Sequence, residues 1–329
     1  MKILVTGGGG YVGCLLVEKL LRAKHEVFVL DLFIYGEPRE VFREFFNSKM
    51  LKSVKGDIRD IDLVDNLLSE VEAVIHLACI SNDPSFELNK SLGKSINYDC
   101  FFPIIKKSKK KVKKFIYASS SSVYGIKNEN NVTENLLLDP LTDYSKYKAK
   151  CEEILLNESG SQLSPIILRP ATVCGYSLRT RFDVIVNILT NHAINNKKIT
   201  IYGGLQKRPN IHIEDMTDVY LEILKQPDEI VREQIFNVGF ENHTLKELAL
   251  IVKKNISHDI KIEFQETDDP RSYHISSKKI SEKINFLPKK NIDDAIIDLM
   301  NAFKSKCFKN SMTNPKYFNI KMLEKINLK

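Results

Sequence analysis

A tyrosine and a lysine four residues apart, Tyr144 and Lys148, have the side chains needed for acid–base chemistry. One turn of helix would place both side chains on the same face. A phenol with a pKa of about 10 is a poor base at neutral pH, but a neighbouring lysine ammonium favours the phenolate. The pair therefore suggests proton abstraction from an alcohol. The spacing alone does not decide, because Tyr317 and Lys321 repeat it.

A run of four serines, Ser119 to Ser122, precedes Tyr144 and gives it a structural context. The run follows an apolar stretch at 115–119 that predicts a β-strand, and the segment from Tyr144 onward predicts a long helix. In an open α/β sheet, ligands bind at the carboxyl ends of the strands, where these serines would lie. Tyr317 has no such strand before it and lies in a basic tail, so Tyr144 is the preferred base.

A glycine-rich turn near the N-terminus predicts a dinucleotide site. Residues 3–6 predict a strand, Gly7, Gly10 and Gly13 follow, and an amphipathic helix comes next. These glycines allow a tight turn, let backbone N–H groups approach a pyrophosphate, and let the helix pack closely on the sheet. The second predicted strand ends in Asp31, whose carboxylate can accept hydrogen bonds from ribose hydroxyls and would repel a 2′-phosphate. We therefore expect NAD rather than NADP; the alternative is a purely structural turn and a strand-ending acid.

Other candidate cofactor contacts follow from the same arrangement. They lie in the glycine turn or just after the third and fourth predicted strands, and they are Tyr11, Val12, Asp57, Ile58, Leu77 and Ala78. Asp57 and Ile58 would contact adenine, while Leu77 and Ala78 would line the cofactor channel. His76, beside them, is at least as well explained as a buried structural histidine.

The elements that must position these residues alternate along the first half of the chain. Short apolar runs separated by amphipathic stretches are typical of βα units and a parallel sheet. Six such runs predict strands, at 3–6, 27–30, 51–54, 73–77, 115–119 and 165–168. We expect an α/β fold with a doubly wound parallel, Rossmann-type sheet and a smaller α+β substrate domain. Residues 1–170 would form the NAD-binding domain with 211–239 packing back onto it, and 171–210 and 240–329 would form the substrate-binding domain.

Composition narrows the class of protein. The 329 residues are 43% hydrophobic, which can supply a full core. No apolar run approaches the roughly 20 residues needed to cross a bilayer, and the N-terminus lacks the layout of a signal peptide, so we expect a cytoplasmic protein without membrane contact. Six cysteines and seven histidines are scattered without ligand spacing, so we expect neither disulfides nor a metal.

Two lysine clusters contribute to the net charge of +7. Residues 106–114 hold seven lysines, and the segment after Phe303 holds seven lysines and one acid, Glu324. Neither cluster has the interleaved aromatic residues of a single-strand binding groove. We interpret both as solvated surface and do not expect nucleic-acid binding; attraction of an anionic substrate is a milder alternative.

Together, the glycine turn with Asp31, the segment from Ser121 to Gly125 and the Tyr144 and Lys148 pair resemble the extended short-chain dehydrogenase/reductase family. More narrowly, they resemble its NAD-dependent nucleotide-sugar epimerase and dehydratase branch. The resemblance implies that Tyr144 is the catalytic base and that Lys148 lowers its pKa and binds the nicotinamide ribose. It also implies that Ser120, or next Ser122, hydrogen-bonds the reacting hydroxyl, and that Asn97 lies near the cofactor. A role for Asn97 in starting a helix is the alternative.

The resemblance also implies substrate contacts in the second half of the chain. The segment at 179–187 resembles the family's loop and helix over the substrate, and the implied substrate-binding residues there and nearby are Thr172, Asn187, Arg208 and Arg271. The two arginines match positions that often grip a diphosphate, for which a planar guanidinium is well suited; surface salt bridges are the alternative. Cys174 stands where tyrosine is common, and packing explains it better than a second acid–base role.

Departures from the family pattern favour one reaction type. The 4,6-dehydratases of the family carry an Asp-Glu pair where this chain has Ser121 and Ser122, so water elimination would lack its acid and base. We therefore expect oxidation and reduction of a nucleotide-diphosphate sugar through a 4-keto intermediate, most simply by a 4-epimerase. A 4-dehydrogenase or 4-keto-sugar reductase is the alternative, and an NAD-binding protein that binds RNA or a partner is a third. By resemblance we expect a homodimer.

Overall fold

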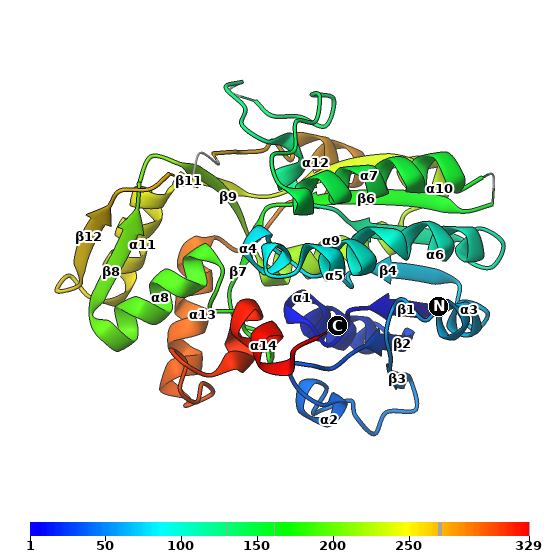
Figure 1. The fold of residues 1–329 in the computed structure, drawn as a ribbon, viewed down its shortest axis with the longest axis horizontal. Helices are drawn as coiled ribbons and strands as arrows, with labels where there is room; N and C mark the ends of the chain where they lie inside the picture. The colour runs from blue at the N-terminus through cyan, green and yellow to red at the C-terminus, as the bar shows by residue number, and fades with distance from the viewer. Residues whose placement is uncertain (130, 161, 269–271, 329) are drawn as a thin grey trace.

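The computed structural model describes residues 1–129, 131–160, 162–268 and 272–328. Its centre is a seven-stranded sheet in the order β10-β6-β5-β4-β1-β2-β3, in which all neighbouring strands are parallel (Figure 1). The strands are β1 (Lys2–Thr6), β2 (Glu26–Asp31), β3 (Leu51–Lys55), β4 (Ala73–His76), β5 (Lys114–Ala118), β6 (Ser164–Pro170) and β10 (Gln234–Val238). From β1 the strands that follow in sequence are added first on one side, as β2 and β3, and then on the other side, as β4, β5 and β6. Doubly wound sheets bind ligands at this switch point, which here lies between β1 and β4. The predicted fold class is confirmed.

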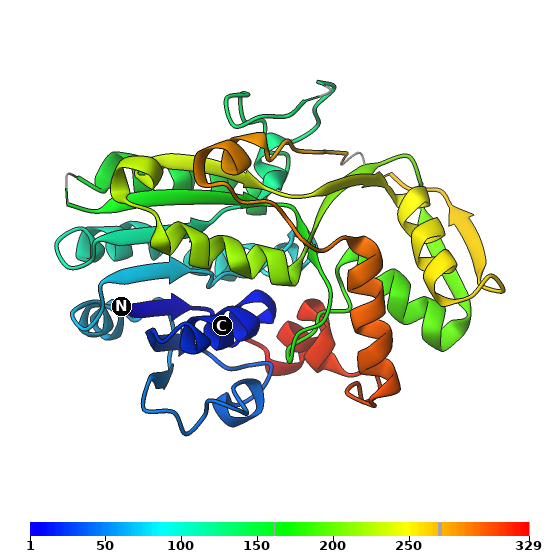
Figure 2. The same cartoon turned by 180° about the vertical axis from the view of Figure 1, so that it is seen from behind.

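Helices cover both faces of this sheet. Figure 1 shows the face covered by α3 (Ile61–Leu68), α6 (Phe101–Ser108) and α7 (Asp143–Glu158). The opposite face, in front in Figure 2, carries α1 (Tyr11–Arg22) and α9 (Ile213–Lys225). Two large apolar clusters, one on each side, therefore form the core.

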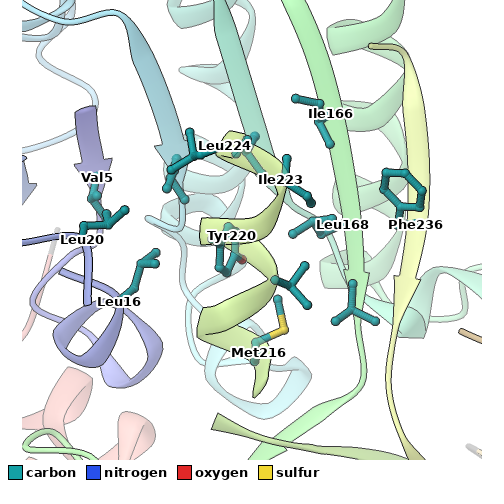
Figure 3. Close-up of a cluster of buried hydrophobic side chains, with 14 of the residues drawn as sticks. Val5, Leu16, Leu20, Ile166, Leu168, Met216, Tyr220, Ile223, Leu224 and Phe236 are labelled. Carbon is teal, nitrogen blue, oxygen red and sulfur yellow. The ribbon is translucent and has the colours of Figure 1, made fainter. Parts of the chain in front are cut away.

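Figure 3 shows how the second of these faces is packed. Leu16 and Leu20 of α1 and Tyr220 of α9 meet side chains of the sheet, including Val5 and Leu168. All of these side chains are buried, and each contributes about 1.5–3 kcal/mol through removal of apolar surface from water. This packing fixes the starts of α1 and α9 at the carboxyl edge of the sheet.

A smaller lobe lies beyond that edge. It contains the mixed sheet β11-β9-β7, the pair β12-β8 and a third apolar cluster. Its elements are β7 (Thr172–Cys174), α8 (Ile185–Asn196), β8 (Lys198–Tyr202), β9 (Lys207–His212), β11 (Glu241–Thr244), α11 (Leu245–Ile256), β12 (Lys261–Gln265) and α13 (Ile292–Lys304). The chain enters this lobe after β6, returns to the large sheet as α9 and β10, and leaves it again. The domain boundaries expected from the sequence stay a prediction.

Short elements complete the chain. They are α2 (Pro38–Val41), α4 (Asp83–Glu87), α5 (Lys90–Lys94), a π-helical turn (Ser95–Asp99), 3-10 turns (Ser121–Tyr124 and Pro315–Tyr317), α10 (Asp228–Val231), α12 (Lys278–Ile284) and α14 (Asn319–Ile326). Both views place α14 between the smaller lobe and the large sheet (Figures 1 and 2). In the described part of the chain, no helix has the length and apolar character required to span a bilayer.

Candidate functional site

A cavity of about 360 Å³ opens at the carboxyl edge of the large sheet and is lined by both lobes. Its volume falls in the range of roughly 300–1,000 Å³ that is usual for ligand sites. Most residues proposed from the sequence line it together: Gly7, Gly10, Tyr11, Val12, Gly13, Asp31, Asp57, Ile58, Leu77, Ala78, Ser120, Ser122, Tyr144, Lys148 and Thr172. Residues far apart in the chain thus meet in one place, as strand ends in a doubly wound sheet should.

The glycine turn has the geometry that a pyrophosphate site requires. Gly7 adopts a positive φ of 74°, and a Cβ there would lie 2.7 Å from the backbone nitrogen of Ala78. A Cβ at Gly13 would lie 2.4 Å from the carbonyl oxygen of Gly7. No side chain caps the start of α1 at Gly10, so the first N–H groups of the helix stay available for an anion.

Asp31 lies beside this turn at the end of β2. Its Oδ2 accepts a hydrogen bond from the Gly9 backbone N–H at 2.9 Å, and its Oδ1 accepts one from that of Phe33 at 2.7 Å. Burial raises the pKa of Asp31, and these two backbone bonds oppose the rise. Each carboxylate oxygen keeps a second lone pair for a ribose hydroxyl. The turn and Asp31 together fit the adenosine diphosphate half of NAD.

Tyr144 and Lys148 lie on the first turns of α7, as the spacing predicts. The helix starts with a capping box between Thr142 and Ser145, which fixes the position of Tyr144. The Lys148 Nζ donates a hydrogen bond of 2.6 Å to the carbonyl oxygen of Ala118, the last residue of β5. It lies 5.9 Å from the ring centroid of Tyr144.

The electrostatics of Tyr144 differ from the expectation. Burial raises the pKa of Tyr144 well above its ordinary value, and the nearby Cys79 and Asp83 add to the rise. The main cation that opposes the rise is Arg181 rather than Lys148. The role expected of Lys148 in lowering this pKa stays a prediction for the loaded enzyme.

The two candidate serines face the same cavity. Their hydroxyl oxygens, Ser120 Oγ and Ser122 Oγ, are 2.8 Å apart, and the Ser122 backbone N–H donates to Ser120 Oγ at 3.1 Å. Ser121, between them, is buried and also lines the cavity. The structure therefore presents a hydroxyl pair to the cavity, so either serine has the position to hydrogen-bond a substrate hydroxyl.

A buried network behind the catalytic elements was not foreseen from the sequence. Glu152 of α7 pairs with Arg169 of β6 at 2.6 Å, and these side chains are only 3% and 4% exposed. Glu152 also accepts a hydrogen bond from Ser119, and Arg169 donates one to the Tyr124 hydroxyl at 2.8 Å. The network joins α7, β6 and the serine segment. The sequence does contain a signal for it: Glu152 follows Lys148 by four residues, so Tyr144, Lys148 and Glu152 lie on the same face of the helix.

Several predicted residues lie outside the cavity lining. Asn97 holds the loop after β4, since its Oδ1 accepts from the Ile80 N–H at 2.8 Å and its Nδ2 donates to the Ile80 carbonyl oxygen at 3.0 Å. Asn187 is fully buried, where its Nδ2 donates to the Tyr11 hydroxyl at 3.1 Å. Both side chains bond to residues of the cavity wall, and the cofactor and substrate contacts expected of them stay predictions.

Of the two predicted diphosphate arginines, Arg208 is not itself a lining residue of the cavity but contacts one, Tyr273. Arg208 lies with its guanidinium 5.2 Å from the ring centroid of Tyr273 and donates to the Lys207 carbonyl oxygen. Arg271 lies outside the described residues. The roles implied for these two arginines stay predictions.

Cys174 is buried against Ile211, and burial raises the pKa of its thiol, so packing accounts for this cysteine.

Two arginines at the start of the segment expected to lie over the substrate also line the cavity. Arg179 and Arg181 come from the segment after β7, and both side chains are almost fully buried. The Arg181 Nε donates to Asp183 at 2.8 Å and its Nη1 to Ser81 Oγ at 3.0 Å. Within the described chain, Arg179 Nε and Arg181 Nη2 have no hydrogen-bond partner. Buried guanidinium groups with open donors suit an anionic ligand.

Comparisons with known proteins agree with this geometry. The model of a family described as the NAD dependent epimerase/dehydratase family matches residues 3–239, which is more than half of the chain. A UDP-glucose 4-epimerase from Lactobacillus helveticus is 27% identical over 333 residues, covering 93% of this chain and 98% of the relative. UDP-glucuronic acid decarboxylase 1 from Arabidopsis thaliana is 25% identical over 93% of this chain and 70% of its own length.

A solved structure gives the same fold. The UDP-glucuronic acid 4-epimerase from Bacillus cereus, crystallised with UDP-glucuronic acid and NAD, superimposes with a TM-score of 0.83 and 24% identity. The match covers 93% of this chain and 100% of that one. The smaller lobe as well as the large sheet is therefore shared.

Proposed function

The chain belongs to the NAD dependent epimerase/dehydratase family, and on that premise we propose that it is a nucleotide-sugar 4-epimerase. Members of this family are NAD-dependent enzymes. Membership therefore confirms the family resemblance and the NAD cofactor that were inferred from the sequence, and it excludes the non-enzymatic alternative. The 4-epimerases among its relatives support the finer assignment.

One observation carries the proposal. A tyrosine, a lysine and a pair of serine hydroxyls meet in the cavity that also contains the dinucleotide turn. Where family dehydratases have carboxylates, this chain has Ser121, which is buried, and Ser122. Asp83 does line the cavity, but its carboxylate accepts a hydrogen bond from the Thr142 hydroxyl that caps α7. The arrangement thus favours reversible alcohol oxidation over water elimination.

The residues divide the reaction between them. NAD, when bound, supplies the acceptor for the sugar's hydride and the donor that returns it. Ser120 and Ser122 would orient the C4 hydroxyl, and Tyr144 would remove its proton as the C4 carbon becomes a ketone. Rotation of the 4-keto sugar within the cavity, and return of the proton by Tyr144, would give the opposite configuration at C4.

Charge in the cavity suits a diphosphate substrate. Arg179 and Arg181 lie at the wall formed by the smaller lobe, and each has an open donor among the described residues. Arg181 also favours the phenolate of Tyr144, since it lowers the pKa that burial raises. A single cation therefore has the position both to hold an anionic ligand and to assist the base.

The test is a panel of UDP- and dTDP-sugars incubated with the purified enzyme and followed by proton NMR. A 4-epimerase converts one sugar into its C4 epimer with no accumulation of NADH. The alternative, a 4-dehydrogenase or 4-keto-sugar reductase, would change the NADH absorbance in proportion to product. Stoichiometric NADH formation without epimer would refute the proposal.

We further propose that the enzyme is a homodimer and acts in the cytoplasm. The surface formed by the π-helical turn, α6 and α7 carries the exposed Phe102 and the neighbouring rings of Tyr98 and Tyr147, whose centroids are 5.0 Å apart. Apolar and aromatic groups of this kind are enriched in interfaces. Sedimentation velocity that gives only monomer at micromolar concentration would contradict the dimer.

A further inference from the structure

The chain does not end in the smaller lobe but returns to the cofactor domain. After α13, residues 305–328, here called the C-terminal strap, run between the two lobes and include α14 (Figure 1). The family match ends at residue 239, so the strap lies outside it. From sequence alone the strap is a basic tail, and the structure shows where it lies.

An aromatic cluster holds the first half of the strap. Phe308 and Tyr317 pack around Phe182, with ring centroids 4.8 Å and 5.3 Å from that ring. The Phe182 backbone N–H donates to the carbonyl oxygen of Tyr317 at 2.9 Å. Phe182 follows Arg181 directly, so the strap is attached to the segment that carries the two cavity arginines.

Asn319 then joins the strap to two other parts of the chain. Its Nδ2 donates to Ser81 Oγ at 2.8 Å, its backbone N–H donates to Asp183 at 2.7 Å, and its Oδ1 accepts from Arg179 Nη2 at 2.5 Å. The side chain is only 4% exposed. Ser81 follows β4 in the cofactor domain, whereas Arg179 and Asp183 belong to the segment after β7. Asn319 therefore closes a polar link across the cavity.

The second half of the strap forms part of the cavity wall. Leu323 and Leu328 line the same cavity as Asp57 and Ile58, and both leucines pack against the apolar cluster that contains Ile58. This is the half of the cavity that the sequence assigns to adenine. A ligand lying there would have the strap on one side and the large sheet on the other.

We propose that the C-terminal strap is part of the cofactor site, in which Asn319 and Leu323 enclose NAD and slow its release. The value of such retention rests on the proposed function, because a 4-epimerase takes and returns one hydride and never needs to exchange its cofactor. A dehydrogenase, by contrast, would be slowed by it. Slow cofactor release by the strap therefore suits a reaction in which the same NAD accepts and returns the hydride.

The experiment measures cofactor release and needs no sugar substrate. Full-length enzyme loaded with NADH is mixed with excess NAD, and the loss of bound NADH fluorescence gives the dissociation rate. Asn319→Ala and Leu323→Asn are compared with Lys325→Ala, an exposed position on the same helix. Asn319→Ala removes the side-chain bonds to Ser81 and Arg179 but keeps the backbone bond to Asp183, so release should become about tenfold faster or more, while Lys325→Ala should match the parent.

Two results would overturn the proposal. Unchanged release in both strap variants, with thermal unfolding midpoints close to that of the parent, would show that the strap does not retain the cofactor. Tighter NADH binding in either variant would show that the strap competes with it. Because release is measured without sugar, failure of the 4-epimerase assignment leaves this result readable on its own.

Discussion

Replacing Glu152 by alanine should destabilise the protein by about 3–5 kcal/mol, the range found when one partner of a buried ion pair is removed. The burial of the Glu152 and Arg169 side chains and the hydrogen bonds between them support a loss within this range. Arg169 donates from Nε and Nη2 to the Glu152 carboxylate at 2.6–3.2 Å, and both side chains are at most 4% exposed. Without Glu152, the Arg169 guanidinium would keep its charge and its 2.8 Å bond to the Tyr124 hydroxyl but lose its counter-ion.

The assay is urea unfolding at pH 7, followed by circular dichroism, for Glu152→Ala and for four proteins that form a double-mutant cycle. They are the parent, Glu152→Gln, Arg169→Met and the double variant. The isosteric Glu152→Gln keeps an acceptor but loses the charge, so it should cost about 1.5–3 kcal/mol, as for a hydrogen bond to a charged group. The double variant should be less destabilised than the sum of its parts by at least about 1 kcal/mol.

The outcome also bears on catalysis, because Glu152 anchors the helix that carries Tyr144. A loss below about 1 kcal/mol for Glu152→Ala, together with additive energies in the cycle, would refute the assignment of this pair as a stabilising network. It would then be a tolerated buried pair with no effect on the position of α7.

Two further predictions concern the glycine turn and a buried histidine. Gly13→Ala should abolish NADH binding, measured by fluorescence titration, because the new Cβ would lie 2.4 Å from the Gly7 carbonyl oxygen. Gly10→Ala should weaken binding less, because its Cβ would lie 3.1 Å from the same oxygen. Equal binding by the two variants would contradict the turn geometry. Burial lowers the pKa of His76 from 6.5 to about 3. Between these pH values the unfolded chain binds a proton at His76 that the folded chain does not. The free energy of unfolding therefore falls as pH drops from about 6.5 towards 3. His76→Gln should remove about 1.4 kcal/mol per pH unit from that slope in urea unfolding between pH 6 and 4, and an unchanged slope would contradict it.

Much of the fold could be predicted because its signals are local. Residues 3–6, the glycines after them and the helix from Tyr11 form one continuous pattern, and the structure has β1 and α1 at those places. Asp31 and Tyr144 were found because each lies at a fixed point of a βα unit. Such positions depend on periodicity and turn chemistry, which a sequence displays directly.

The missed features depend on contacts between distant segments. Arg179 and Arg181 look like ordinary loop arginines until the fold buries them beside the cavity. Asn319 lies in a lysine-rich stretch that reads as solvated surface, yet it bonds to residues 238 and 140 positions away. Likewise, the spacing of Tyr144 and Lys148 does not reveal that burial has the largest effect on the pKa of Tyr144, because burial is a property of the assembled fold.

The most direct test of the account is the rate of C4 epimerisation by Tyr144→Phe, measured by NMR with the best sugar from the panel. Phenylalanine keeps the ring in its buried position and removes only the hydroxyl that takes the proton. The account predicts unchanged NADH binding and a loss of turnover of about 100-fold or more, as expected for a general base. Turnover within a few-fold of the parent, with NADH still bound, would contradict Tyr144 as the base and with it the proposed mechanism.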